Sequence, residues 1–259
     1  MPPLQGVGIL VTRPELQAMA LCRLLEAEGA STFRLPALEI RPLKDRRALA
    51  GQLGALDDFD VIVFTSANSV RFGVSFLEQK RDLTLAAIGP ATARALNQAG
   101  YRVAINPSEA FDTESLLSHP RLASVSGHRI LVIKGSDGRQ LLQQELTRRG
   151  AAVTSADVYE RVPWQPTEAA LAQALDWFAA GEAHAVTATS LETGEALLNM
   201  ATPALRAEFE RAHWLVPNDR VATGLRGMGL QAPLLRAESP ADQDLIAALI
   251  RWRSSVSGA

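Results

Sequence analysis

Polar side chains with hydroxyl, amide or basic groups follow apolar, strand-like runs at several places in this sequence. At 63 to 70 the chain reads VFTSANSV, so Thr65, Ser66 and Asn68 come directly after apolar residues. Hydroxyl groups, free backbone N–H groups and the positive end of a following helix all suit an anion. The pattern therefore indicates anion binding at strand ends, and the open alternative is that Ser66, Asn68 and Ser190 only cap helices. The other candidate binding residues at such positions are Thr12, Arg13, Gly89, Thr92, Lys134, Gly135, Ser136 and Thr189.

Motifs of other common chemistries do not occur in the sequence. KGSDGR at 134 to 139 lacks the glycine and lysine spacing of a P-loop. VFTSANSV does not form the G-x-S-x-G turn of a serine hydrolase, and no G-x-G-x-x-G follows the first predicted strand. The four histidines, at 119, 128, 184 and 213, do not have metal-ligand spacing. We therefore expect neither a metal nor a cofactor.

The elements that would position these residues alternate along the chain. Apolar, strand-like runs at 7 to 12, 84 to 88 and 129 to 133 are followed by helical patterns at 15 to 29, 91 to 100 and 138 to 150. Alternating strands and helices predict an α/β fold with parallel sheets covered on both faces. The helical patterns end at Gly29, Gly100 and Gly150, as expected of helix stops, and each of these glycines precedes another short extended run. Further strands are predicted at 59 to 65, 184 to 189 and 213 to 216, and RWRSSVSGA at the end is expected to be disordered.

Composition limits the function classes. The 259 residues are 47% hydrophobic, with a formal net charge of −2, so no general basic field favours nucleic-acid binding. The single cysteine, Cys22, forms no internal disulfide and is typical of a reducing compartment. The start MPPLQGVGIL does not resemble a signal peptide, and no long apolar run predicts a membrane span. We therefore expect a soluble, cytoplasmic protein.

The two halves of the chain resemble each other. The segment at 8 to 42 aligns with the segment at 129 to 163 at a constant offset of 121 without a gap. VIVFTSANSV at 61 to 70 also matches AVTATSLETG at 185 to 194. We therefore predict two similar, doubly wound parallel-sheet units with a ligand cleft between them, where the ligand lies beyond the carboxyl ends of the strands.

Six short segments together carry a family resemblance. They read VTRP (11 to 14), FTSANSV (64 to 70), AIGPATARAL (87 to 96), KGSDGR (134 to 139), DVYER (157 to 161) and ATSLETGEALL (188 to 198). Each is degenerate alone, but the ordered set spans nearly the whole chain and is similar to uroporphyrinogen-III synthase. One segment departs, because LVPNDRVA at 215 to 222 stands where the family often repeats IGP-x-T-A. Asp219 there would repel a carboxylate, so we expect Asn218 or Arg220 to compensate.

The resemblance implies a domain organisation. The first domain would combine residues 1–36 with 165–259, and the second would be the continuous stretch 42–157. Residues 37–41 and 158–164 would be extended linkers, at equivalent positions of the repeat. Two such linkers permit a hinge motion of the domains.

The resemblance also implies an activity without a cofactor. The family closes hydroxymethylbilane, a linear tetrapyrrole polycarboxylate, into uroporphyrinogen III with inversion of the last ring and loss of water. The reaction passes through an azafulvene and a spiro intermediate. Tyr159 matches the family's functional tyrosine, and a phenol stays protonated at neutral pH, so we expect it to donate a proton to the leaving hydroxyl. The protein would otherwise act chiefly by orienting the bilane.

Two other functions fit the same strand ends. One is a two-domain transferase acting on a phosphorylated sugar, and the other is a non-catalytic sensor that binds a small anion. If the chain has the activity of the family that it resembles, we expect a monomer with no nucleic-acid or membrane partner. Such a monomer could contact transiently the enzyme that supplies the bilane.

Overall fold

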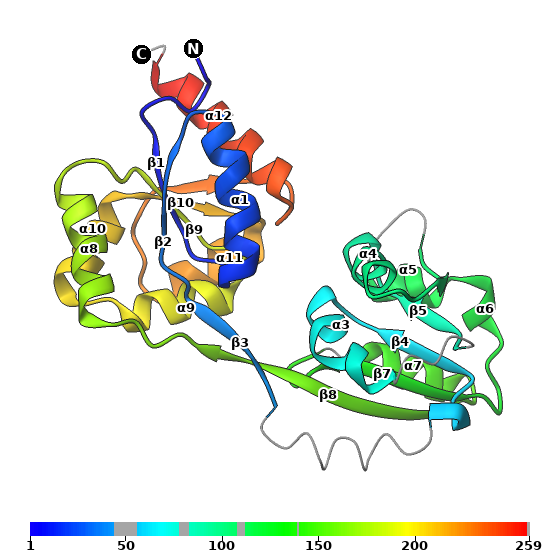
Figure 1. Ribbon diagram of the computed structural model, residues 1–259. Helices are drawn as coiled ribbons and strands as arrows, with labels where there is room; N and C mark the ends of the chain where they lie inside the picture. Colours follow the sequence, from blue (N-terminus) through cyan, green and yellow to red (C-terminus); the bar gives the residue numbers. More distant parts are fainter. Residues whose placement is uncertain (44–55, 78–82, 108–111, 139, 258–259) are drawn as a thin grey trace. The chain divides into compact units, whose positions relative to one another are not determined.

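The computed structural model describes residues 1–43, 56–77, 83–107, 112–138 and 140–257 of the chain (Figure 1). The chain forms two compact units. Unit 1 comprises Met1–Glu39 and Val162–Ala259, and unit 2 comprises Ile40–Arg161. Both boundaries fall inside strands, namely β3 (Leu38–Pro42) and β8 (Ala152–Pro163). The chain therefore crosses between the units twice, each time in extended conformation.

Unit 1 is built on a five-stranded sheet with the order β11-β10-β9-β1-β2, in which all neighbouring strands are parallel. Its strands are β1 (Gly8–Val11), β2 (Ser31–Arg34), β9 (Ala185–Thr187), β10 (His213–Val216) and β11 (Leu234–Arg236). Its helices are α1 (Glu15–Ala27), α8 (Glu168–Ala179), α9 (Leu191–Met200), α10 (Pro203–Arg211), α11 (Asp219–Gly227) and α12 (Asp242–Ser257).

Helices cover both faces of this sheet because its strands are apolar on both sides. Leu10 packs in one buried cluster with residues of α8, α9, α10 and α11. Its neighbours Ile9 and Val11 pack in a second cluster with residues of α1 and α12. Successive side chains of a strand point to opposite faces, so the short run of apolar residues in β1 supplies both cores.

Unit 2 has a six-stranded sheet with the order β3-β8-β7-β4-β5-β6. The neighbours from β8 to β6 are parallel, whereas β3 is antiparallel to β8, since Trp164 N donates to Ala37 O and Leu43 N donates to Val158 O. Its other strands are β4 (Val61–Phe64), β5 (Leu85–Ala87), β6 (Val103–Ile105) and β7 (Arg129–Gly135). Its helices are α3 (Ala67–Gly73), α4 (Pro90–Gln98), α5 (Thr113–Leu117), α6 (Pro120–Ala123) and α7 (Leu141–Arg148), with 3-10 turns at Leu56–Asp58 and Val74–Leu77.

The two sheets share one arrangement. The order β11-β10-β9-β1-β2 corresponds strand by strand to β6-β5-β4-β7-β8. The register agrees as well, because Gly8 pairs with Ser31 in unit 1 and Arg129 pairs with Ala152 in unit 2, each 121 residues later. The common topology and register support an internal duplication of the chain.

The structure confirms the predicted α/β class and corrects several local predictions. Gly29, Gly100 and Gly150 end their helices with φ values of 90°, 87° and 87°, as expected of helix stops. The short extended runs expected after these glycines are β2, β6 and β8, whereas the pattern analysis missed β11. The segments expected as linkers lie largely in the hydrogen-bonded strands β3 and β8. The expectation of a disordered C-terminal segment is wrong for the described residues, because α12 continues to Ser257.

The half-buried His213 joins the start of β10 to α12. Its ring centroid lies 4.7 Å from that of Trp252. Burial lowers the pKa of His213 below its ordinary value of 6.5, and the nearby His184 lowers it further through charge, while a backbone hydrogen bond to His184 opposes this. Glu208 and Arg211 line the same hollow. The folded state therefore disfavours the protonated ring.

We expect this histidine to make the stability of unit 1 depend on pH. A pKa that is lower in the folded state gives stability that is complete above the unfolded value of 6.5 and is lost as the pH falls through the folded pKa. A His213→Phe variant keeps a ring against Trp252 and removes the titration. Its melting temperature should fall less than that of the wild type between about pH 7.5 and pH 5. Parallel losses in both proteins would exclude His213 as the cause.

Candidate functional site

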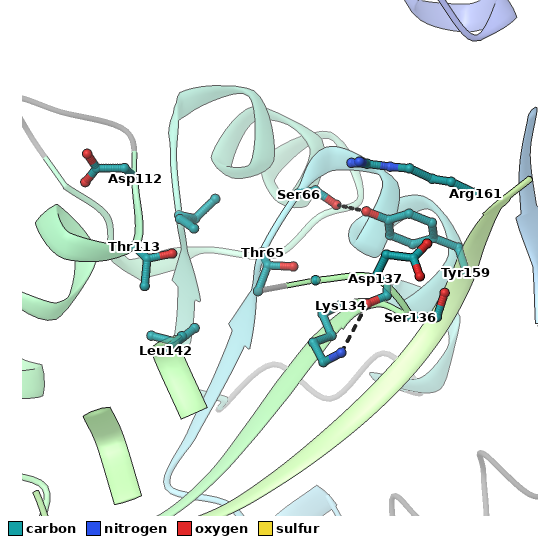
Figure 2. A pocket seen from close by; sticks show the side chains of 13 residues that line it. Thr65, Ser66, Asp112, Thr113, Lys134, Ser136, Asp137, Leu142, Tyr159 and Arg161 are labelled. Atoms are coloured by element: carbon teal, nitrogen blue, oxygen red, sulfur yellow. Dashed lines mark hydrogen bonds between the residues drawn. The ribbon is translucent and has the colours of Figure 1, made fainter. Parts of the chain in front are cut away.

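A pocket of about 410 Å³ lies in unit 2 at the carboxyl ends of β4 and β7 (Figure 2). Parallel strands bring their carboxyl ends to one edge of a sheet, which is where ligands bind in open α/β folds. Six residues predicted from the sequence line the pocket together, namely Thr65, Ser66, Lys134, Gly135, Ser136 and Tyr159. The pattern of polar strand ends therefore located a real concavity.

Tyr159 is held on β8 by a local irregularity of the sheet. The pairing of β7 with β8 shifts between Lys134 and Gly135, and Ser136 N donates to Tyr159 O at 2.9 Å. The Tyr159 ring lies against Gly135, where a Cβ atom would stand 2.6 Å from Cζ. Only 4% of the residue is exposed, and its ring centroid is 6.0 Å from that of Phe72. The absence of a side chain at position 135 thus makes room for a fixed phenol that lines the pocket.

Ser66 places a second hydroxyl beside this phenol. Its Oγ lies 3.2 Å from the Tyr159 hydroxyl oxygen (Figure 2). Ser66 is the N-cap of α3, and its Oγ accepts a hydrogen bond from Ser69 N at 2.9 Å. The preceding Thr65 directly follows β4 and donates from Oγ1 to Ile133 O at 3.4 Å. Ser66 therefore caps a helix and also lines the pocket, and its part in substrate binding stays a prediction.

Lys134 does not present an uncompensated charge. Only 8% of this residue is exposed, and its Nζ lies 2.8 Å from Asp157 Oδ1 in an ion pair. The same Nζ donates to Gly135 O at 3.2 Å. The expected contribution of Lys134 to anion binding is therefore offset in large part by Asp157.

Pattern reasoning missed several charged residues of the pocket. Arg161, Asp112 and Asp137 line it, together with Thr113. Arg161 is exposed and leaves β8 on the same side as Tyr159 (Figure 2). The spacing of two residues on a predicted extended segment places both side chains on one face, and this signal could have identified Arg161. The pocket is lined by both positive and negative side chains, whereas a site for a simple anion would be lined mainly by positive groups and hydrogen-bond donors.

Three other residues predicted for binding in unit 2 are not among the lining residues of this pocket. Asn68 is half-buried in the first turn of α3. Gly89 is the N-cap of α4, and Thr92 in the same helix is 3% exposed. A part in substrate binding stays a prediction for these three.

Two predicted residues in unit 1 make contacts within that unit. Thr12 has no exposed surface; its N donates to Thr187 Oγ1 at 3.1 Å, and its Oγ1 donates to Thr187 O. Arg13 pairs with Asp242 and also donates to Pro240 O, and 11% of its side chain is exposed. These contacts join β1 to β9 and to the start of α12. A part of Thr12 and Arg13 in substrate binding stays a prediction.

The remaining predicted residues of unit 1 stand at helix starts. Ser190 caps α9, where its Oγ accepts from Thr193 N at 3.1 Å, and Thr189 next to it is half-buried. Asn218 caps α11 and accepts from Val221 N at 3.1 Å. The Arg236 guanidinium beside Asp219 holds the pKa of that carboxyl below its ordinary value. The charge of Asp219 is thus paired, so its expected repulsion of a carboxylate is reduced.

Comparison with known proteins identifies what the chain is similar to. A family model described as uroporphyrinogen-III synthase HemD matches residues 20–247. The uroporphyrinogen-III synthase of Escherichia coli K12 is 31% identical over 253 residues, which cover 93% of this chain and 98% of that protein. The Salmonella typhimurium LT2 enzyme is 30% identical over 252 residues, with coverages of 93% and 98%.

Solved structures agree with the fold. A mutant uroporphyrinogen III synthase from the extremely thermophilic bacterium Thermus thermophilus superimposes with a TM-score of 0.58 at 19% identity, covering 98% of this chain and all of that one. The uroporphyrinogen-III synthetase of Helicobacter pylori 26695 gives a TM-score of 0.58 at 15% identity, with coverages of 95% and 99%. At these identities the likeness concerns the fold alone.

Proposed function

The chain belongs to the uroporphyrinogen-III synthase HemD family, and from this premise we propose that the pocket beside Tyr159 removes the terminal hydroxyl of the bilane. The protein is an enzyme that closes hydroxymethylbilane into uroporphyrinogen III. The observation that carries the proposal is the fixed phenol of Tyr159, which lines a pocket and has its oxygen 3.2 Å from the Ser66 hydroxyl.

Tyr159 supplies the proton that the leaving group needs. The bond from the terminal carbon to the hydroxyl oxygen breaks, its electron pair stays on the oxygen, and the phenol hydrogen moves there, so that water leaves. The pyrrole nitrogen provides the electron pair that stabilises the remaining methylene and releases its own hydrogen to solvent, which gives the azafulvene. Solvent then returns a proton to the Tyr159 oxygen. The net change is loss of one water molecule.

The mixed charges of the pocket suit this substrate better than a simple anion. A bilane carries carboxylates at its periphery and N–H donors on its pyrroles. The exposed Arg161 offers a guanidinium, which binds carboxylates in a bidentate manner. Asp137, also exposed, offers acceptor oxygens for pyrrole N–H groups. Both residues line the same pocket as Tyr159, so a ring and its side chains can be held together.

Orientation determines which product forms. Uncatalysed closure of the bilane gives the uninverted isomer I, so the enzyme must favour the spiro route over direct closure. Holding the reacting carbons in a fixed geometry is sufficient for such a preference. We expect single binding residues to have shallow effects, because many weak contacts share this task.

The product distribution tests the proposal. Hydroxymethylbilane is generated in situ, the purified protein is added, and the oxidised uroporphyrins are separated by chromatography. We expect isomer III to dominate. Isomer I alone, from folded protein and fresh substrate, would refute the activity. A thermal shift with a sugar phosphate in the same buffer tests the transferase reading, which family membership does not favour.

The partners and location follow the same proposal. The small-molecule partner is the tetrapyrrole, and a monomer in transient contact with the enzyme that makes the bilane stays a prediction. We propose a cytoplasmic location because the only cysteine, Cys22, is a buried free thiol, as is typical of a reducing compartment. Among the described residues, no helix has both the length and the apolar character that a membrane span requires.

A further inference from the structure

The Ser66 side chain is fixed by an unusually complete set of hydrogen bonds. Its Oγ accepts from Ser69 N at 2.9 Å. In return, Ser69 Oγ accepts from Ser66 N at 3.0 Å and donates to Ser66 O at 2.7 Å. This reciprocal capping box holds the Ser66 oxygen in place at 3.2 Å from the Tyr159 oxygen.

Counting hydrogens leaves two arrangements of the contact between Ser66 and Tyr159, and only one of them leaves the phenol hydrogen for a substrate. A serine hydroxyl carries one hydrogen, and the Ser66 oxygen already accepts from Ser69 N. If the Ser66 hydrogen points to Tyr159, the phenol hydrogen is left for the pocket, which Tyr159 lines. If Tyr159 donated to Ser66 instead, the phenol could not donate to a substrate in that state.

We propose that Ser66 is a positioning residue that donates its hydroxyl hydrogen to Tyr159 and so directs the phenol hydrogen toward the leaving hydroxyl of the substrate. This inference rests on the proposed function. As the phenol hydrogen moves to the leaving oxygen, negative charge develops on the Tyr159 oxygen. A hydrogen bond to a charged oxygen is roughly twice as strong as one to a neutral oxygen. The contact therefore strengthens in the transition state, and its loss should lower kcat while KM stays unchanged.

The duplicated unit provides an internal comparison. Ser190 of unit 1 occupies the position equivalent to Ser66, caps α9 through Thr193 N at 3.1 Å, and lies 2.8 Å from Thr193 Oγ1. The residue equivalent to Tyr159 at the repeat offset of 121 is Leu38, which has no hydroxyl. The cap therefore forms without a tyrosine. The pairing of a capping serine with a phenol is an addition in unit 2.

A double-mutant cycle separates positioning from capping. We expect Ser66→Ala to lower kcat about 5- to 10-fold with KM unchanged, and Tyr159→Phe to lower it more. In the Tyr159→Phe background, adding Ser66→Ala should cause no further loss of kcat, because the group on which Ser66 acts is already absent. Ser66→Thr, which keeps both the cap and the hydroxyl, should restore most of the rate.

Two variants control for the helix cap. Ser66→Asp keeps an N-cap acceptor but has no hydrogen to donate as a carboxylate, so it should be at least as slow as Ser66→Ala. Thr202→Ala removes the matched cap of α10, where Thr202 Oγ1 accepts from Leu205 N at 3.3 Å. Its melting temperature should fall about as much as that of Ser66→Ala, with unchanged kcat.

If the wild type makes isomer III, independent effects of Ser66→Ala and Tyr159→Phe on kcat would overturn the inference. So would a loss in Ser66→Ala as large as in Tyr159→Phe, because Ser66 would then itself be the donor to substrate. Isomer I alone from the wild type would overturn the proposed function and this inference together.

Discussion

A Gly8→Ala variant is expected to melt about 10 °C or more below the wild type. Gly8 begins β1, and a Cβ atom there would stand 1.7 Å from Glu182 O and 2.8 Å from Trp177 Cζ2. A backbone oxygen cannot rotate away as the end of a side chain does, so the start of β1 must shift. Gly8 N donates to His184 Nδ1 at 3.0 Å and Gly8 O accepts from His184 N at 2.8 Å, and both bonds would be strained. We estimate a loss of about 3 to 5 kcal/mol in the free energy of unfolding of unit 1.

Gly227 provides the matched control. It ends α11 in the same unit, and a Cβ atom at this position would meet no atom within 4 Å. Gly227→Ala should therefore be neutral or more stable by about 0.5 to 1 kcal/mol, because alanine has less freedom in the unfolded chain. Thermal and urea unfolding of both variants measure the difference. Equal melting temperatures of Gly8→Ala and wild type would show that the loop at Glu182 yields without cost.

Replacing Tyr159 with phenylalanine is expected to lower kcat about 10- to 100-fold, at or below the lower end of what general acids contribute. The ring keeps its place on Gly135 and beside Phe72, so the variant should stay folded. It loses the phenol proton and the 3.2 Å contact with Ser66. Azafulvene formation is intrinsically easy for an electron-rich pyrrole, which is why the loss is not larger. Steady-state rates and the fraction of isomer III measure the two consequences separately.

The other tyrosine of the chain controls for the chemical change. The sequence has two tyrosines. Tyr101 is half-buried and packs against the apolar cluster of unit 2 that contains Tyr159, but it does not line the pocket. Tyr101→Phe should retain the wild-type rate. A Tyr159→Phe enzyme within twofold of the wild type, with isomer III still dominant, would contradict the role of Tyr159 as proton donor.

Much of the fold could be predicted from the sequence because apolar strands and helix stops are local signals. The runs at 59 to 65, 129 to 133 and 213 to 216 contain β4, most of β7, and β10. The strand that escaped notice is β11, which has only three residues. None of them is fully buried, so neither an apolar run nor an alternation of polarity identified it.

The site was predictable in part. Thr65 and Ser66 follow the buried strand β4, and Lys134 lies near the end of β7, so their position at the sheet edge could be expected from topology. The partners of these residues could not be predicted, because contacts such as that between Ser66 and Tyr159 join residues 93 apart in the sequence. Arg13 shows the same limit more strongly, since its ion pair with Asp242 spans 229 residues. Local sequence spacing indicates that a polar residue lies at the end of a strand. It does not indicate whether a distant part of the chain already forms a hydrogen bond or an ion pair with that residue.

The division of the chain into one continuous and one interrupted unit also orders the events of synthesis. Strand β1 leaves the ribosome early, but its neighbour β9 follows much later, as the contact between Gly8 and His184 spans 176 residues. Unit 2 has no such delay, because Ile40–Arg161 is one stretch. Domains fold as units as they emerge. We therefore expect the unit with the Tyr159 pocket to complete its sheet while β1, α1 and β2 still lack β9, so that unit 1 closes after unit 2.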